Sequence, residues 1–258
     1  MTIALPAWIE RLNRLDHTNP DFTLTREEIA LEWERMRATP KSPERPVLCL
    51  AGYHAWHFMV AGFSSRLRSL VGGPREMYLP VSYPFTGDIR LCAEKAAQRV
   101  KERWGEGTEI DVVAVSMGGL VARLGALPTE KGGLERLNIA RLFTLATPHN
   151  GAILADKVGG LRPDAAAQCM KPGSEFLANL NAALPNASYQ LTCYARTNDT
   201  WVGATNAAPP GRDVHWVGGT RFMSHIMITT DRLILTDVAR RLRGETPVSK
   251  RASKPVCD

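Results

Sequence analysis

The chain has 258 residues, of which 44% are hydrophobic and 22% are charged. This composition is ordinary for a globular protein and excludes a chain that is mainly disordered. No run of about 18 apolar residues occurs, so we expect no stable insertion into a membrane. The length fits a single α/β domain.

The formal net charge is +6, and the stretch 240–258 holds six basic residues against two acidic ones. Most of the positive excess therefore belongs to the C-terminal end. No basic stripe interleaved with aromatic residues occurs in the rest of the chain, so we expect no nucleic-acid partner. We interpret residues 244–258 as a basic, flexible tail.

The five cysteines form no CxxC pair, and their odd number argues against a disulfide framework or a zinc site. The N-terminus lacks the basic start and long apolar stretch of a secretory signal, so we expect a cytoplasmic protein. No phosphate-binding glycine motif follows a predicted strand, and no group of side chains has metal-ligand spacing. We therefore expect neither a cofactor nor a metal.

Residues 1–45 are predicted to form a helical N-terminal extension. Thr25 and Glu28 have the spacing of a capping box, which indicates the start of a helix. Apolar residues then recur at helical spacing until Pro40, which predicts the helix end before that proline.

Residues 46–243 are predicted to form one α/β domain. Six apolar runs predict strands, at 46–51, 77–82, 110–115, 141–146, 189–195 and 213–218. Helical periodicity occurs at 57–71, 88–104, 117–126 and 225–243. Continuous apolar runs are typical of strands buried on both faces. Strands that alternate with helices therefore predict a mostly parallel central sheet with helices on both faces.

Residues 152–188 interrupt this alternation with several glycines and prolines and a short predicted helix near 174–184. A connection of this length is usually functional or disordered, and we interpret it as a lid-like insert over an active site. Met170, Phe176, Leu177 and Leu180 fit one helical face. This face either lines a pocket for an acyl chain or packs on the core, and both alternatives stay open.

The main chemical signal lies in residues 111–123. An apolar run precedes Ser116, Gly118 and Gly119 follow it, and a helical pattern comes next. This strand–turn–helix context is the one that a nucleophile elbow needs, although an ordinary turn is the alternative. Ala114 replaces the first glycine of the G-x-S-x-G pattern, and one added methyl keeps the turn feasible.

These residues resemble the elbow of α/β-hydrolases of the lipase and esterase type, including bacterial lipases with alanine at the first elbow position. The resemblance extends over about residues 46–242. Three further segments are similar: residues 50–54 to the H-G-x oxyanion segment, 146–151 to the T-P-H-x-G segment, and 170–180 to a Pro-Gly-Ser turn that opens a helix. The resemblance implies a single α/β-hydrolase domain and acyl transfer through a serine.

A nucleophilic serine needs a general base, and the base needs a carboxylate that orients it. The chain order in this fold is serine, acid, histidine, and three histidines follow Ser116. His225 opens the last predicted helix, where the resemblance implies the catalytic base. His149 follows the elbow too soon, and we expect it to pack beneath the site. His215 lies inside an apparent strand and is expected to be structural.

The acid is expected at a strand end between the serine and the histidine. Asp199 follows the run 189–195, in a loop that resembles the D-x-x-V pattern of the family. Asp213 precedes a strand and is interpreted as a turn residue. Of the remaining aspartates in this part of the chain, Asp156 and Asp164 lie in the insert, and Asp231 and Asp237 are expected on the exposed face of the final helix.

The developing oxyanion needs backbone donors, and the resemblance implies two of them. One is the N–H of Met117, directly after the serine, and the other is the N–H of Tyr53, which Gly52 allows to approach closely. The family's histidine before that glycine is Ala51 here, so a side chain that often braces this loop is missing. His54 either replaces it or is an ordinary loop residue.

The sequence thus predicts a carboxylic-ester hydrolase, similar to an esterase or triacylglycerol lipase, that acts on a small-molecule ester or lipid. Ser116 would attack the ester, His225 would transfer the proton, and Asp199 would orient the imidazole. An acyltransferase or thioesterase would use the same triad. A hydrolase-fold binding protein without turnover is a further alternative, against which the intact order of the three residues argues.

Overall fold

The computed structural model describes residues 18–128, 136–157, 164–220 and 223–256. Helix α2 (Arg26–Ala38) begins at Thr25, whose hydroxyl accepts from the N–H of Glu28 at 3.1 Å. The Glu28 carboxylate accepts in return from the N–H of Thr25 at 2.7 Å, so the predicted capping box is confirmed.

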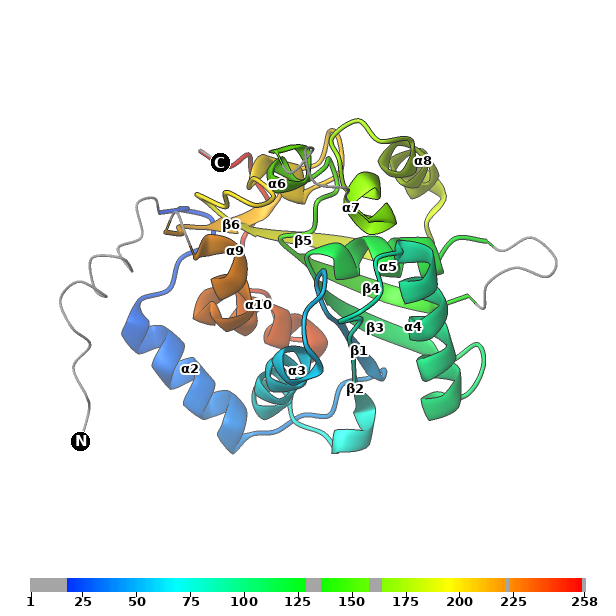
Figure 1. The fold of residues 1–258 in the computed structure, drawn as a ribbon. Coiled ribbons are helices and arrows are strands. Elements are labelled where there is room, and N and C mark those ends of the chain that lie inside the picture. Colours follow the sequence, from blue (N-terminus) through cyan, green and yellow to red (C-terminus); the bar gives the residue numbers. More distant parts are fainter. Residues whose placement is uncertain (1–17, 129–135, 158–163, 221–222, 257–258) are drawn as a thin grey trace.

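The central sheet has six parallel strands in the order β2-β1-β3-β4-β5-β6 (Figure 1). The strands are β1 (Val47–Leu50), β2 (Tyr78–Val81), β3 (Glu109–Val115), β4 (Asn138–Leu145), β5 (Gln190–Arg196) and β6 (His215–Val217). Each of them overlaps one of the predicted apolar runs. The predicted fold class, a parallel sheet with helices on both faces, is confirmed.

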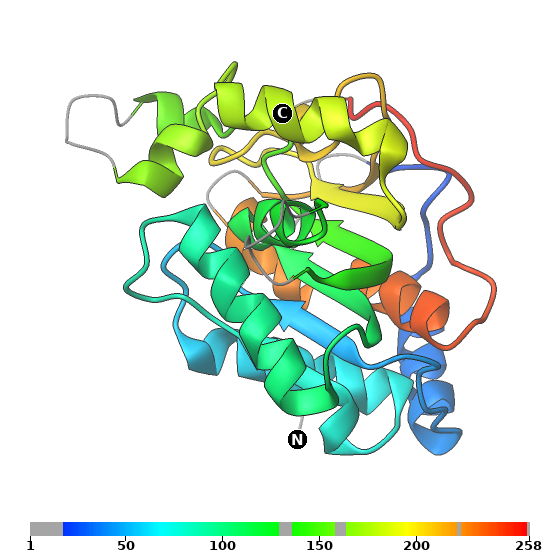
Figure 2. The same cartoon turned by 90° about the vertical axis from the view of Figure 1, so that its right-hand side faces the viewer.

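Helices cover both faces of the sheet (Figures 1 and 2). After α2, the described residues form helices α3 (His57–Val71), α4 (Ile89–Trp104), α5 (Met117–Gly125), α6 (Ile153–Lys157), α7 (Ala165–Cys169), α8 (Glu175–Ala183), α9 (Ser224–Met227) and α10 (Arg232–Leu242). Short 3-10 turns are η1 (Arg75–Met77), η2 (Leu184–Asn186), η3 (Thr205–Ala207) and η4 (Ile228–Thr230). Helices α3 and α10 pack together on one face with α2 outside them, and α4 and α5 pack together on the other.

Each strand contributes to two cores, because successive side chains point to opposite faces of a sheet. Leu48 and Leu50 of β1 join the cluster under α4 and α5. Val47 and Cys49 join the cluster under α3 and α10. Burial on both faces explains why the strands appear in the sequence as continuous apolar runs.

The predicted helix 225–243 is wrong as one element, because the chain breaks at Asp231 into α9, η4 and α10. Asp231 has an extended backbone (φ −63°, ψ 116°), and its carboxylate accepts from the N–H groups of Leu233 and Ile234. It is thus the N-cap of a new helix rather than an interior residue of a longer one.

The prediction that Asp231 and Asp237 are exposed is also wrong, because the Asp231 side chain is only 12% exposed and Asp237 is buried. Asp237 is fully buried, and its Oδ2 accepts from the Tyr194 hydroxyl at 2.7 Å and from Arg241 Nε at 2.9 Å. A charge inside a protein needs such partners, and these partners come from β5 and from the next turn of α10.

The segment 244–256 differs from the expected flexible tail, because it is anchored along the body. The N–H of Lys250 donates to the carbonyl of Asp21, and the N–H of Ser249 donates to Asp237 at 2.7 Å. Ser253 pairs with Val214 in an isolated antiparallel bridge. The basic tail is therefore tied both to the N-terminal side of the chain and to the sheet.

The strand order reverses between β1 and β3. The chain leaves β1 for β2 at one edge, whereas β3 leads toward β4, β5 and β6 at the other. The loops that follow β1 and β3 therefore flank one crevice at the carboxyl ends of the strands, which is where open α/β sheets bind ligands. Among the described residues, no helix is both long and apolar enough to cross a membrane.

Candidate active site

Ser116 occupies a strained turn between β3 and α5. Its backbone has φ 52° and ψ −127°, a conformation that residues other than glycine rarely adopt. The N–H of Ser116 donates to the carbonyl of Leu145 at 2.8 Å, and its carbonyl accepts from the Thr147 hydroxyl at 2.8 Å. Both backbone polar groups are thus held by residues at the end of β4.

The glycines after Ser116 allow α5 to approach the sheet closely. A Cβ on Gly118 would lie 2.6 Å from the carbonyl oxygen of Ala51, and a Cβ on Gly119 would lie 2.2 Å from Thr147 Oγ1. Ala114, in contrast, lies within β3 and contributes its methyl to the buried core. The missing glycine of the pattern is therefore accommodated in the strand, before the turn begins.

The structure brings the predicted nucleophile, base and acid into one hydrogen-bonded chain. His225 Nε2 lies 3.0 Å from Ser116 Oγ, and His225 Nδ1 lies 2.9 Å from Asp199 Oδ2. The three residues are 9%, 9% and 2% exposed in the order base, nucleophile, acid. A neutral imidazole that donates from Nδ1 to the carboxylate can accept from the serine at Nε2.

The acid is held by the loop that follows β5. The second oxygen of Asp199 accepts from the N–H groups of Trp201 at 2.9 Å and Val202 at 3.0 Å. The Trp201 ring also stacks on the His225 imidazole, with centroids 5.1 Å apart. Sequence reasoning missed Trp201, although its position two residues after the predicted acid was the available signal.

The acid loop and the histidine loop are tied to each other. Thr197 Oγ1 accepts from the N–H of Gly219 at 3.0 Å, and the carbonyl of Thr197 accepts from Ser224 Oγ at 2.7 Å. The Asn198 amide donates to the carbonyl of Gly219 at 2.8 Å. Sequence analysis missed these residues, which bring β5 and β6 loops together so that Asp199 meets His225.

The predicted oxyanion donors lie on two sides of the nucleophile. Met117 is the first residue of α5, so its N–H has no acceptor inside the helix, and the helix N-terminus favours negative charge. A Cβ on Gly52 would lie 3.1 Å from Ser116 Cβ, so the loop after β1 passes directly beside the serine. Tyr53 follows in that loop and lines the same cavity as Ser116.

His149 lies beneath the site and does not line the cavity. Its Nδ1 accepts from Arg123 Nη1 at 2.8 Å, and its Nε2 lies 3.1 Å from Thr144 Oγ1. Burial, and then the Arg123 charge, hold the pKa of His149 well below its usual value, so the imidazole is neutral. Its carbonyl accepts from Asn181, and Arg123 donates to the carbonyl of Leu180. His149 thus connects α5 and α8 through the turn after β4.

The other histidine and aspartate candidates lie outside the triad, and one of them, Asp164, lines the cavity. His215 packs between the rings of Phe22 and Tyr194. Asp213 is exposed on the approach to β6. Asp164, by contrast, lines the cavity and contacts Tyr53. The sequence offered no signal for that contact, because the two residues are far apart in the chain.

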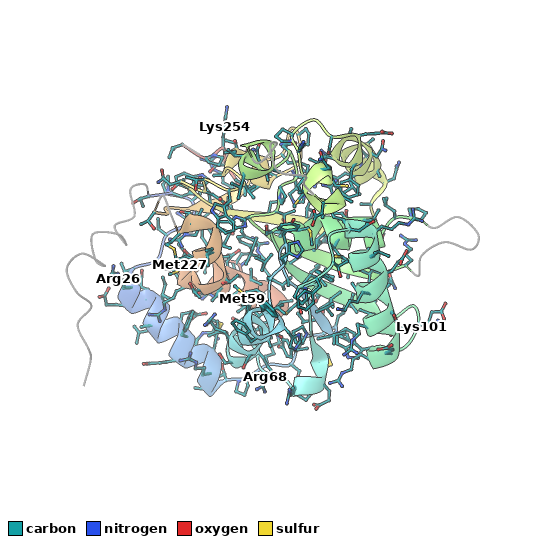
Figure 3. All side chains as sticks on the ribbon, in the orientation of Figure 1. Arg26, Met59, Arg68, Lys101, Met227 and Lys254 are labelled. Carbon is teal, nitrogen blue, oxygen red and sulfur yellow. The ribbon has the colours of Figure 1, made fainter. Side chains whose placement is uncertain are left out.

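A cavity of about 650 Å³ opens beside Ser116 and His225. Apolar side chains from several elements line much of it, including Met59, which Figure 3 labels, Val60 and Phe63 of α3, Leu154 of α6, Ala167 of α7, Met170 and Ile226. The insert therefore forms part of the wall through α6, α7 and Met170.

The apolar face of α8 packs on the core and does not line the cavity, which decides between the two alternatives left open by the sequence. Leu180 is buried in the core under α4 and α5, and Phe176 packs against the same core. Neither residue lines the cavity beside Ser116. The apolar face of α8 thus covers the body of the protein, whereas the shorter α6 and α7 approach the serine.

Comparison with known proteins gives structural matches but no sequence match. No protein-family model and no curated protein matches the chain. The propeptide form of Bacillus licheniformis lipase BlEst2 matches with a TM-score of 0.56 and 14% identity, over 93% of this chain and 54% of that one. Its mature form matches with a TM-score of 0.51 and 13% identity, over 78% and 94%. The chain has the α/β-hydrolase fold.

A third match is more partial. Legionella pneumophila phospholipase PlaB, in its complex with thio-NAD, has a TM-score of 0.50 and 16% identity, over 63% of this chain and 44% of that one. The chain thus spans less than two thirds of PlaB and of the BlEst2 propeptide form. In this fold, the loops that carry Ser116, Asp199 and His225 meet at the carboxyl ends of the strands.

Proposed function

We propose that the protein is a serine hydrolase that cleaves carboxylic esters through an acyl-enzyme on Ser116. The observation that carries the proposal is the continuous chain of hydrogen bonds from Ser116 through His225 to Asp199, at 3.0 and 2.9 Å. This chain ends at a largely apolar cavity, where a substrate can reach the serine.

In the first half of the reaction, His225 Nε2 accepts the proton of Ser116 as Oγ attacks the ester carbonyl. Asp199 accepts from Nδ1–H and stabilises the imidazolium that forms. The negative charge on the former carbonyl oxygen is stabilised by the N–H groups of Met117 and Tyr53. The imidazolium then protonates the leaving alkoxide, and the alcohol departs from the acyl-enzyme.

In the second half, a water molecule takes the place of the alcohol. His225 accepts a proton from this water, whose oxygen attacks the acyl carbon. The same backbone donors stabilise the second oxyanion. The imidazolium returns its proton to Ser116, and the carboxylic acid leaves. The cycle needs only the ester and water.

The cavity supports an apolar acyl group as part of the substrate. Pockets of this size bind small molecules, and each methylene removed from water contributes about 0.8 kcal/mol. The names of two structural matches, a lipase and a phospholipase, support lipid esters as the substrate class. The proposal therefore favours esters with an acyl chain over short polar esters.

The proposal is tested with p-nitrophenyl esters of increasing chain length and the variant Ser116→Ala. We expect hydrolysis by the wild type and a fall in kcat on the order of 10⁶-fold in the variant. Ser65→Ala, at an exposed position of α3, is the matched control and should keep the wild-type rate. A folded Ser116→Ala protein with near wild-type turnover, or a wild type inactive on the whole series, contradicts the proposal.

The acid is tested separately with Asp199→Asn. An amide at this position favours the wrong imidazole tautomer, so we expect kcat to fall by roughly 10⁴-fold while the fold persists. Asp213→Asn, at an exposed position, is the control and should leave kcat unchanged. If Asp213→Asn is the damaging change and Asp199→Asn is silent, the acid is assigned to the wrong loop.

A further inference from the structure

One carboxylate in the cavity joins the loop after β1 to the insert. We name residues 51–56 the oxyanion loop. The Tyr53 hydroxyl donates to Asp164 Oδ2 at 2.8 Å, and His54 Nε2 lies 3.2 Å from the same oxygen. The rings of Tyr53 and His54 pack against each other with centroids 4.1 Å apart. Two consecutive side chains of the loop therefore converge on a single oxygen.

The other oxygen of Asp164 belongs to α7. Oδ1 accepts from the N–H of Ala167 at 2.9 Å, so Asp164 is the N-cap of this helix. The segment between β2 and α4 encloses the carboxylate from a third side. A Cβ on Gly87 would lie 2.2 Å from Asp164 Oδ2, and the carbonyl of Gly87 accepts from Ala166 N–H. The contact is thus a junction of three segments.

Both ring nitrogens of His54 face acceptor oxygens. Nδ1 lies 2.9 Å from the carbonyl oxygen of Pro84, which can only accept, so Nδ1 carries a proton. Nε2 faces a carboxylate oxygen, which also accepts. Because both side chains of the pair with Asp164 are partly exposed, the pair contributes little to stability, and its effect is on geometry.

The oxyanion loop needs such support. His54 has φ 48°, in the left-handed region that residues with a Cβ rarely adopt. Ala51 leaves the loop without a side chain that could brace it from its start. Burial, and then Asp164, raise the pKa of Tyr53 to about 12, so its hydroxyl remains a donor to the carboxylate. The residue whose N–H is the expected oxyanion donor is therefore itself fastened at its side chain.

We propose that Asp164 and His54 are positioning residues, which hold the Tyr53 N–H at the oxyanion and couple the oxyanion loop to helix α7 of the insert. This inference rests on the proposed ester hydrolysis. Asp164 would act through Tyr53 without touching the reacting atoms. The arrangement implies that a displacement of α7 changes the rate of the chemical step and not only the shape of the cavity.

The test uses Asp164→Asn and His54→Gln. Asparagine keeps the helix cap but cannot accept from Tyr53 and His54 with its nitrogen. Removing an oxyanion donor lowers kcat by about 10²–10³-fold, so we expect a displaced donor to lower it about tenfold, with KM unchanged. The Ki of an alkylboronic acid, whose tetrahedral adduct resembles the transition state, should rise by the same factor.

The double variant and a matched control sharpen this test. Because both substitutions break one junction, the double variant should be no slower than the slower single variant. Asp213→Asn, at an exposed position before β6, is the control and should change neither constant. Unchanged kcat and boronate affinity in Asp164→Asn and His54→Gln overturn the inference, as does a rise in KM alone.

A second readout separates this inference from the proposed function. Hydrogen exchange of residues 52–56 reports on the junction whether or not an ester is turned over. We expect faster exchange of this segment in Asp164→Asn and no change in Asp213→Asn. Equal exchange in the wild type and Asp164→Asn overturns the inference, whereas loss of the Ser116 dependence of hydrolysis overturns only the proposed function.

Discussion

Unusual backbone conformations in this protein are concentrated at the candidate site. In the described ranges, the residues other than glycine with positive φ are His54, Ser116, Ala146 and Asn198. They follow the carboxyl ends of β1, β3, β4 and β5. Each such residue costs about 1–3 kcal/mol, and the surrounding hydrogen bonds hold it in place. The strain thus occurs in loops that turn sharply around Ser116.

The lowered pKa of His149 predicts how the stability of the protein depends on pH. Its pKa in the folded protein lies well below that of an exposed histidine, chiefly because of burial and then because of the Arg123 charge. The unfolded chain therefore binds this proton first, and stability falls as the pH drops below about 6.5, by up to about 1.4 kcal/mol per pH unit. Above that pH, this contribution is fully present.

This prediction is checked by measuring the free energy of unfolding of the wild type and His149→Gln in urea, with assays at about pH 7.5 and about pH 5. The variant should be less stable at the upper pH, because it disrupts buried hydrogen bonds. It should also lose less stability than the wild type on acidification. Equal pH dependence in the two proteins would show that His149 takes up no proton preferentially in the unfolded chain.

Some residues of the candidate site could be predicted from the sequence because their signals are local. Ser116 stands between an apolar run and two glycines, and His225 follows the last strand in the expected order. Asp164 could not be predicted, because its role depends on a contact with Tyr53 that the path of the insert creates. The prediction that Asp237 is exposed was wrong for the same reason, since its partners Tyr194 and Ser249 come from other segments of the chain.

At the scale of elements, the position of α5 depends on its glycines. Gly119→Ala would place a methyl 2.2 Å from Thr147 Oγ1, and we expect the free energy of unfolding to fall by about 1–3 kcal/mol. Gly62→Ala in α3 is the matched control, because nothing lies within 4 Å of the added Cβ. It should stabilise the protein by about 0.5–1 kcal/mol. Equal effects would contradict the close packing of α5.

Helices α7 and α8 of the insert are expected to affect activity differently. Ala167→Phe fills part of the cavity from α7, so kcat/KM should fall for an octanoate ester far more than for a butyrate ester. The difference can reach about 3 kcal/mol for four methylenes. Phe176→Ala on α8 should reduce Tm and leave the ratio of the two esters unchanged. A chain-length effect of Phe176→Ala would return α8 to the pocket wall.

The elements themselves were predictable to different degrees. Helix α3 has the predicted bounds, because Gly72, with φ 104°, provides a clear end. The break at Asp231 was missed, because the apolar periodicity of residues 225–243 continues through it. An aspartate can cap a helix or lie on its surface, and the choice depends here on burial next to Arg196.

At the scale of the molecule, the sequence indicated the alternation of strands and helices but not their spatial order. The order β2-β1-β3-β4-β5-β6 places the loops after β1 and β3 side by side, and it puts the histidine loop beside the acid loop. Strand order follows from which helices pack together on each face. Such contacts between distant segments leave no periodic pattern in the sequence.

The anchored tail predicts that the C-terminal segment contributes to the stability of the whole domain. Deletion of residues 249–258 removes two hydrogen bonds from Ser249 to the buried Asp237, and the contact of Ser253 with Trp216. We expect the free energy of unfolding to fall by about 2–4 kcal/mol in urea titrations. Deletion of residues 255–258 alone is the control and should have little effect. Equal stability of both truncated proteins would restore the interpretation as a flexible tail.

The position of Trp201 has a consequence for the fluorescence of the protein. Its indole stacks on the imidazole of His225 and is 40% exposed, so it adjoins both the solvent and the proposed base. In the proposed mechanism the imidazole gains and loses a positive charge twice in each cycle, and we expect a charge this close to the indole to change its fluorescence. Under the proposed mechanism, we therefore expect the emission of Trp201 to report on acylation and deacylation through the charge of His225.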